Sequence, residues 1–173
     1  MQVVSALATQ NNMHCDHVDI SQAFVQGDLL PGDGYNGKVY ISAPPGYDED
    51  PNYVYQLRRP LYGMPSAACA WHHTMSAYLK SQGCTLVGFE RSMWTVVKQG
   101  HVILITAHID DFIIACADRQ VLDAFRTALL QRFEGTYEGE VHTYLGCEIL
   151  RELDKGKTLF ISEALCGGCI AHL

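Results

Sequence analysis

The chain has 173 residues, of which 48% are hydrophobic and 18% charged, and this is enough apolar material for one hydrophobic core. Its formal net charge of −7 argues against a protein that binds nucleic acid through charge alone, because phosphate binding depends on lysine and arginine. The seven cysteines are an odd number spread along the chain, so they do not indicate a disulfide framework. No apolar run approaches the roughly 20 residues of a membrane span. The composition predicts a soluble globular domain that is neither secreted nor held in a membrane.

The first third of the sequence alternates short structured segments with loops. Apolar residues recur at helical spacing over residues 1–11, and residues 13–20 alternate between polar and apolar as a strand does. The polar face of that strand ends at Asp19. Residues 26–37 hold four glycines and predict a loop, after which short strands are expected over residues 38–42 and 53–57.

The remaining sequence predicts two helices among several hairpins. The first helix is expected from Pro65 to Gly83, and the second follows Asp118, which can cap it, and extends to Phe133. Strands are expected over residues 86–89, 93–98, 102–109, 112–116, 141–150 and 158–161. This order predicts an α+β fold in which helices pack on one face of an antiparallel sheet.

Asp110 and Asp111 interrupt the most apolar part of the sequence. Two adjacent carboxylates there are costly unless they are solvated, paired or bound to a metal ion. An exposed two-residue hairpin turn would also explain them, although Asn-Gly or Asp-Gly is the usual choice for such a turn. Asp19 also follows a predicted strand, so the three carboxylates can converge and offer the oxygen ligands that Mg²⁺ prefers.

Two other groups of metal-binding residue types give weaker signals. Cys166 and Cys169 have the C-x-x-C spacing, but no second pair follows at the distance of a zinc finger. His14, Cys15 and His17 are close in sequence, yet residues three apart on a strand point to opposite faces. Neither group by itself predicts a metal site.

Several segments occur in the order and spacing found in one known family. They are residues 19–24 and 27–29, Val39-Tyr40, Pro44-Pro45-Gly46-Tyr47, Leu61-Tyr62-Gly63 with Ala70-Trp71, residues 108–111 and residues 144–149. Through these segments nearly the whole chain resembles the copia-type reverse transcriptases of retrotransposons. Each match alone is weak, but the shared order makes chance a poor explanation.

The resemblance implies a palm-like antiparallel sheet with a ferredoxin-like core and a two-metal nucleotidyl transfer. Asp19 and Asp110 would be the principal ligands of Mg²⁺ or Mn²⁺, with Asp111 as a supporting carboxylate. Ile20 and Phe24 would bind the nucleotide. The Phe24 ring would lie under the sugar and exclude a 2′-hydroxyl by shape, although a phenylalanine at a helix start also fits a core position.

The resemblance also implies partners and a larger context. The partners would be an RNA or DNA template–primer and deoxynucleoside triphosphates. The intact polyprotein would add integrase, fingers, thumb and ribonuclease H, in a cytoplasmic virus-like particle or in the nucleus. Residues 1–173 would form a single reverse transcriptase domain truncated at both ends, with a palm core at about residues 13–150.

The chain departs from the family pattern after Leu61-Tyr62-Gly63. The family has a basic residue, a glutamine, a proline and an arginine where this chain has Pro65, Ser66, Ala68 and Cys69, and His108 replaces an aromatic residue. These departures favour an alternative, a catalytically inactive remnant that acts only as a folded or nucleic-acid-binding module. A third hypothesis is an unrelated ferredoxin-like binding domain in which the aspartate pair forms only a turn.

Overall fold

A computed structural model describes residues 2–34, 37–47, 52–87, 92–162 and 171–172. The chain forms two compact units, unit 1 (Met1–Ser21 and Lys80–Leu173) and unit 2 (Gln22–Leu79). Cys166 and Cys169 lie outside the described residues. The single domain and its palm boundaries stay a prediction, since compact units do not by themselves define separate domains.

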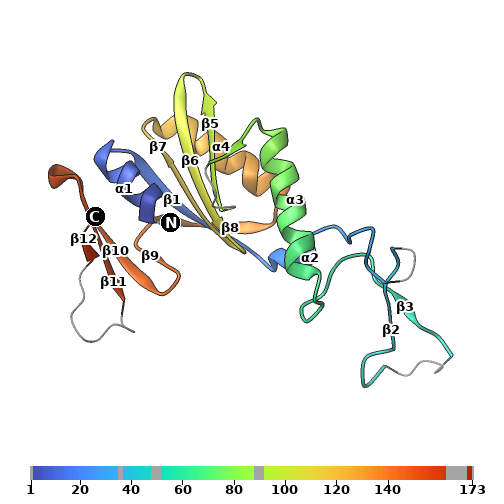
Figure 1. The fold of residues 1–173 in the computed structure, drawn as a ribbon. Coiled ribbons are helices and arrows are strands. Elements are labelled where there is room, and N and C mark those ends of the chain that lie inside the picture. Colours follow the sequence, from blue (N-terminus) through green and yellow to red (C-terminus); the bar gives the residue numbers. More distant parts are fainter. Residues whose placement is uncertain (1, 35–36, 48–51, 88–91, 163–170, 173) are drawn as a thin grey trace. The chain divides into compact units, whose positions relative to one another are not determined.

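A six-stranded antiparallel sheet forms the centre of unit 1, in the order β4-β5-β6-β7-β1-β8 (Figure 1). Its strands are β1 (His14–Ile20), β4 (Thr85–Leu86), β5 (Met93–Lys98), β6 (His101–His108), β7 (Asp111–Cys116) and β8 (Gly135–Glu140). The first strand of the chain is therefore inserted between β7 and β8. This crossover places β1 beside the hairpin that contains Asp110 and Asp111.

Helices cover both faces of this sheet. Helix α1 (Gln2–Gln10) contributes Val4 and Ala8 to a buried cluster that also holds Ile113 of β7. Helix α4 (Arg119–Arg132) lies on the opposite face, where Arg126 binds the carboxylate of Asp16 on β1. The prediction that helices pack on one face is therefore wrong for α1. The reason is that residues 112–116 are all buried, and a strand without polar alternation needs cover on both sides.

A second antiparallel sheet completes unit 1, in the order β12-β11-β10-β9. It is built from β9 (Thr143–Tyr144), β10 (Cys147–Glu152) and β11 (Lys157–Ser162), the last two joined by the 3-10 turn η1 (Leu153–Lys155), and from β12 (Ala171–His172). Arg151 attaches this sheet to the N-terminal segment, because its guanidinium donates to Thr9 Oγ1 at 3.0 Å and to the Met13 carbonyl at 2.6 Å.

Unit 2 contains the short helix α2 (Ala23–Gln26), the two-stranded hairpin β2 (Tyr40–Ile41) and β3 (Tyr55–Gln56), and most of α3 (Ala67–Ser81). Gly27 lies directly against the α3 backbone, where an added Cβ would come within 3.0 Å of the Trp71 nitrogen. The Asp28 amide donates to Thr74 Oγ1 at 2.9 Å. These two contacts attach the end of α2 to α3.

The structure confirms a mixed fold of helices and antiparallel sheets. The helix predicted from Pro65 is α3, and the helix predicted after Asp118 is α4, whose Val121 amide donates to the Asp118 side chain at 3.0 Å. None of the described helices has the length and apolar character needed to cross a membrane.

Candidate active site

The three predicted carboxylates gather at one end of the central sheet. Asp19, near the end of β1, is the direct cross-strand partner of Asp111, the first residue of β7. Asp110 lies in the adjoining turn, and its carbonyl accepts a hydrogen bond from the Ile20 amide at 2.9 Å. The antiparallel pairing of β1 with β7 therefore brings together residues that are about ninety positions apart in the sequence.

The turn that carries Asp110 is tight. His108 and Asp111 pair across the β6–β7 hairpin, which leaves Ile109 and Asp110 as its two central residues. Ile109 has a φ of 56°, a region that β-branched residues rarely adopt. The aspartate pair can therefore belong both to a hairpin turn and to a carboxylate cluster, because the turn that carries the partly buried Asp110 also places it beside Asp19.

Negative charge is concentrated at this end of the sheet. The pKa of Asp19 is raised above its ordinary value, first by partial burial and then by the charges of Asp110, Asp111 and Glu138, while His17 opposes the shift. The ionised form of Asp19 is therefore disfavoured in the folded chain. A bound cation would offset this repulsion.

His17 and Tyr144 hold Asp111. His17 Nε2 lies 2.9 Å from Asp111 Oδ1, and the Tyr144 ring packs edge-on against the imidazole with 6.0 Å between ring centroids. The Tyr144 hydroxyl donates to the Asp111 carbonyl at 3.4 Å. His17 was not among the residues predicted for this site, although a residue two positions before Asp19 on a strand must share its face.

The carboxylates can supply some, but not all, of the ligands that a divalent ion needs. Among residues 2–34, 37–47, 52–87, 92–162 and 171–172, no three His, Cys, Asp or Glu side chains form an arrangement that could hold a metal. Mg²⁺ is usually bound by one or two carboxylates, with water and substrate phosphates completing its shell. Asp19 and Asp110 supply suitable hard oxygen atoms for that kind of incomplete site.

Strand β8 fixes the backbone of β1 at Asp19. Gly135 is paired with Ile20, and a Cβ added to Gly135 would lie 2.4 Å from the Asp19 carbonyl oxygen. The Ser21 amide donates to the Glu134 carbonyl at 3.0 Å. A residue without a side chain at position 135 thus allows β8 to reach the site.

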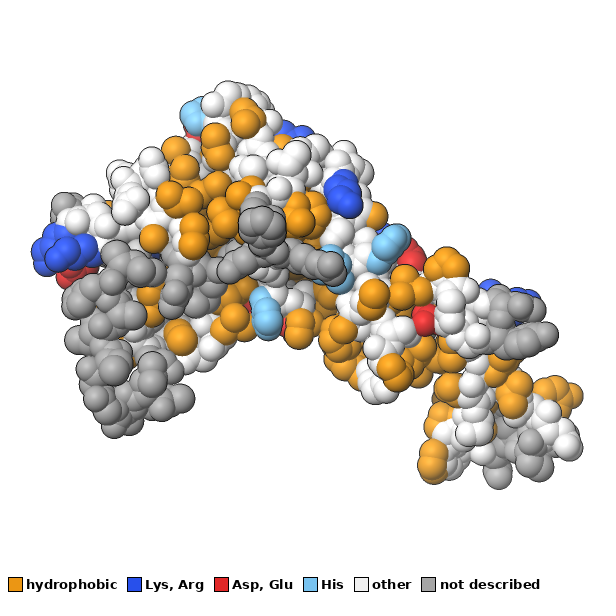
Figure 2. Space-filling model, in the orientation of Figure 1, with side chains coloured by type: hydrophobic (Ala, Val, Ile, Leu, Met, Phe, Trp, Pro, Cys, Tyr) orange, Lys and Arg blue, Asp and Glu red, His pale blue; other side chains and the backbone are white. Residues whose placement is uncertain are grey.

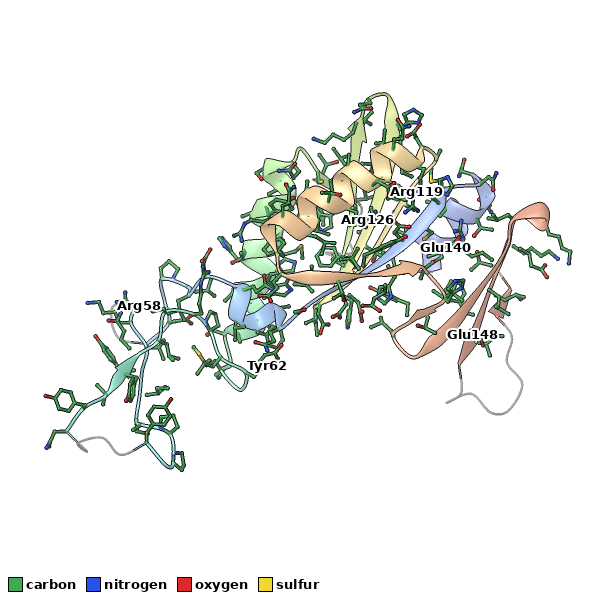
Figure 3. The ribbon with its side chains drawn as sticks, turned by 180° about the vertical axis from the view of Figure 1, so that it is seen from behind. Arg58, Tyr62, Arg119, Arg126, Glu140 and Glu148 are labelled. Carbon is green, nitrogen blue, oxygen red and sulfur yellow. The ribbon has the colours of Figure 1, made fainter. Side chains whose placement is uncertain are left out.

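A buried ionic network supports β1 from the α4 face. The Asp16 side chain is fully buried and accepts from Arg119 at 2.8 Å, from Arg126 and from the Tyr137 hydroxyl at 3.1 Å. Figure 3 shows Arg119 and Arg126 on α4, from which both reach toward the sheet. Asp123 on the same helix also pairs with both arginines. This network links α4, β1 and β8, and it lies on the opposite face of β1 from His17.

The two predicted nucleotide-binding residues differ in their surroundings. Ile20 is only 1% exposed and is part of the core at the end of β1. Phe24 lies in α2 of unit 2 and is half-buried, with its ring 5.0 Å from the Tyr62 ring. Binding of the nucleotide by these residues stays a prediction.

Comparison with known proteins gives one family match and several relatives that agree with it. The sequence pattern of the family described as reverse transcriptase (RNA-dependent DNA polymerase) matches residues 1–163. The chain is 31% identical over 153 residues to the Retrovirus-related Pol polyprotein from transposon RE1 of Arabidopsis thaliana, a match that covers 87% of this chain and 10% of the relative. The corresponding protein from transposon RE2 is 30% identical over 153 residues, with the same coverage.

A more distant relative is the Transposon Ty1-NL2 Gag-Pol polyprotein of Saccharomyces cerevisiae, 25% identical over 167 residues, or 92% of this chain and 9% of the relative. The chain thus spans about a tenth of the length of these polyproteins. The family match covers far more than half of the chain, and the relatives are Pol polyproteins of Ty1/copia-type retrotransposons. The chain therefore belongs to the reverse transcriptase (RNA-dependent DNA polymerase) family, as found in Ty1/copia-type retrotransposons.

Proposed function

We propose that this chain is the catalytic core of an RNA-directed DNA polymerase, which transfers deoxynucleotides to the 3′-hydroxyl of a primer. The observation that carries the proposal is the register of β1 with β7, in which Asp19 lies opposite Asp111 and the Ile20 amide binds the carbonyl of Asp110. On this proposal the six-stranded sheet and α4 form a palm with a ferredoxin-like core.

Asp19 and Asp110 would hold two divalent ions, Mg²⁺ or Mn²⁺, with Asp111 as the supporting carboxylate. The chemistry that these ions supply is activation of the primer hydroxyl and stabilisation of charge on the leaving pyrophosphate. With Asp111 ionised, His17 Nε2 donates to its carboxylate, which suits a supporting role for Asp111.

The proposal extends to the partners of the site. Ile20 and Phe24 would bind the incoming deoxynucleotide, Phe24 by placing its ring under the sugar. The template–primer would be RNA or DNA, and the remaining domains of a Pol polyprotein would supply further contacts. The place of action would be a cytoplasmic virus-like particle or the nucleus.

A second candidate is an inactive remnant that keeps the fold and at most binds nucleic acid. It is favoured by the segment that leads into α3, where the exposed Pro65 and Cys69 stand in place of the family's basic residue and arginine, and Ser66 stands in place of its glutamine. These side chains cannot bind a template or a triphosphate by charge and multiple hydrogen bonds, as an arginine or a glutamine does.

Primer extension on an RNA template with Mg²⁺ or Mn²⁺ separates the two candidates. We expect the chain to incorporate deoxynucleotides and Asp110→Asn to lower the rate by at least about a hundredfold, since one metal ligand is lost. Glu152→Gln, a change at a half-exposed carboxylate of the second sheet, should leave the rate unaltered. If the wild-type chain is folded by circular dichroism but incorporates nothing, the remnant is the correct description.

A further inference from the structure

We propose that Tyr62 is a positioning residue for Phe24, and that the contact between the two rings helps the site to select deoxynucleotides over ribonucleotides. The inference rests on the proposed role of Phe24 under the nucleotide sugar. Its structural basis lies entirely within unit 2, where the two ring centroids are 5.0 Å apart and the ring planes are inclined by 44°. In Figure 3 the labelled Tyr62 lies beside α2.

Phe24 needs a support of this kind. Its helix, α2, has only four residues and follows Gln22, whose backbone is left-handed with φ 49°. A helix of one turn has little stability of its own. The Phe24 side chain is half-buried, so the surrounding core does not fix its ring from all sides. A ring that excludes a 2′-hydroxyl by shape must be held in place, because a small displacement would make room for the hydroxyl.

The segment that carries Tyr62 is itself attached to the end of α2. A tight turn holds Tyr62 and Gly63: the Met64 amide donates to the Leu61 carbonyl at 3.1 Å, and Gly63 has a φ of 91°. Arg59 donates to the Gly27 carbonyl at 3.1 Å and pairs with Asp28.

The segments that carry the two rings are therefore attached to the same part of unit 2. The Gly27–Asp28 segment is held against α3 by the close approach of Gly27 to the Trp71 backbone and by the bond from Asp28 to Thr74. The segment before Tyr62 is tied through Arg59 to the same two residues. Tyr62 thus approaches Phe24 from a loop that is bonded, through Arg59, to the residues at the end of α2.

Tyr62 also differs from the other exposed aromatic residues of unit 2. Figure 2 shows many hydrophobic side chains at the surface of the region around β2 and β3, and Tyr40, Tyr47 and Tyr53 are among its exposed residues. Among the described residues of unit 2, however, Tyr62 is the tyrosine whose ring lies on Phe24. Its 59% exposure leaves the outer face of the ring accessible, so a direct contact with nucleic acid is the competing explanation to be tested.

The test compares kcat/KM for a deoxynucleotide and the matching ribonucleotide in primer extension by the whole chain. Tyr62→Ala should lower the preference for the deoxynucleotide by about two- to tenfold, the range expected for loss of one aromatic pair. Tyr62→Phe keeps the ring and should restore the wild-type preference. Tyr53→Ala removes a tyrosine that is 67% exposed and makes no described ring contact, and it should change nothing.

Phe24→Ala provides the second arm of the experiment. This change should lower the preference by more than Tyr62→Ala does, because it removes the excluding ring itself. The double variant should be no less selective than Phe24→Ala alone, since Tyr62 acts through Phe24. Circular dichroism checks the fold of each variant, and Tyr62→Leu, which keeps apolar bulk without a ring, replaces Tyr62→Ala if the latter does not fold.

The possible failures are distinguishable. If Phe24→Ala alters the preference and Tyr62→Ala does not, the positioning role of Tyr62 is wrong while the sugar-contact role of Phe24 stands. Equal losses for both nucleotides in Tyr62→Ala would also overturn the inference and would assign Tyr62 to template or general nucleotide binding. If Phe24→Ala leaves the preference unchanged, or the wild-type chain incorporates nothing, the proposed function fails and the inference fails with it.

Discussion

At the scale of single residues, Asp19 illustrates how the proposed catalytic cluster of carboxylates opposes stability. Its pKa is raised in the folded chain by partial burial and by the neighbouring charges of Asp110 and Asp111. As the pH rises above the ordinary carboxyl pKa of 3.8, the unfolded chain ionises first, and the folded state loses free energy relative to it until the pH has passed the raised pKa. Below the ordinary value both states are protonated, so the loss is absent.

We therefore expect Asp19→Asn to raise the free energy of unfolding at pH 7 and to have no comparable effect near pH 3. Urea unfolding at the two pH values measures this difference. Glu152→Gln, which removes a half-exposed carboxylate far along the second sheet, serves as the control and should show little change at either pH. Lower stability of Asp19→Asn at pH 7 would contradict the repulsion inferred between the three carboxylates.

The backbone of Ile109 allows a second test at the scale of single residues. Ile109 occupies the left-handed region with φ 56°, and its side chain is 45% exposed. Such a backbone costs a β-branched residue roughly 1–2 kcal/mol, and glycine avoids this cost at an entropic penalty of about 0.5–1 kcal/mol. Ile109→Gly should therefore raise the free energy of unfolding by up to about 1 kcal/mol. Ile161→Gly, at a similarly exposed position in strand β11, should lower it; equal destabilisation by both changes would argue against strain in the turn.

At the scale of elements, the approach of β8 to β1 depends on Gly135. A methyl group at this position would lie 2.4 Å from the Asp19 carbonyl oxygen and 3.1 Å from the Ile20 Cα, so the two strands would have to separate. We expect Gly135→Ala to cost about 1–3 kcal/mol of stability and to reduce primer extension, because the β1 backbone holds Asp19. Urea unfolding and primer extension measure both effects.

Gly32→Ala is the matched control, because a Cβ at that position meets no atom within 4 Å. It should leave both stability and activity close to wild type. If Gly135→Ala is equally harmless, β8 does not constrain the backbone at Asp19, and its pairing with β1 has no part in the site.

The same elements show what sequence patterns can and cannot predict. Strands β6 and β7 and helix α4 follow from apolar runs, from helical periodicity and from a capping aspartate, and the structure confirms them. Strand β8 has the sequence GTYEGE and is mostly exposed, so it carries no apolar alternation and could not be predicted. The strand expected over residues 141–150 is interrupted by Leu145 and Gly146, which both have positive φ and separate β9 from β10.

At the scale of the whole molecule, the sequence resemblance found the three carboxylates, but only the fold supplies their neighbours. The pairing of β1 between β7 and β8 is a long-range arrangement, and local patterns do not specify strand order. His17 shares a strand face with Asp19, but it reaches Asp111 only because β1 pairs with β7, and Tyr144 reaches Asp111 from the second sheet. Likewise, the contact of Phe24 with Tyr62 joins residues that are far apart in the sequence of unit 2.

The charge of the molecule also becomes interpretable once its ion pairs are known. The sequence contains twelve lysine and arginine residues. In the described part of the chain, five of them are held in ion pairs with carboxylates: Arg59, Arg119, Arg126, Arg151 and Lys155. Arg126 and Arg151 are mostly buried in their pairs and largely unavailable to phosphates, whereas Arg59 and Lys155 form exposed pairs that stabilise the fold little. The number of basic residues that are free to contact a nucleic acid is therefore smaller than the twelve in the sequence.

This distribution sets an upper limit on how steeply nucleic-acid binding depends on salt. Each phosphate contact contributes roughly −0.9 to the slope of log K against log salt, so the seven basic residues outside these five ion pairs would give a slope no steeper than about −6 even if all of them met phosphates. Fluorescence anisotropy of a labelled primer–template between 50 and 200 mM salt measures the slope, and Arg58→Ala, which removes an exposed cation without a described carboxylate partner, should make it shallower by about 1. A slope steeper than −6 would require some of the five paired cations to leave their carboxylates, and the exposed Arg59 and Lys155 can do so without disturbing the Asp16 network between α4 and β1.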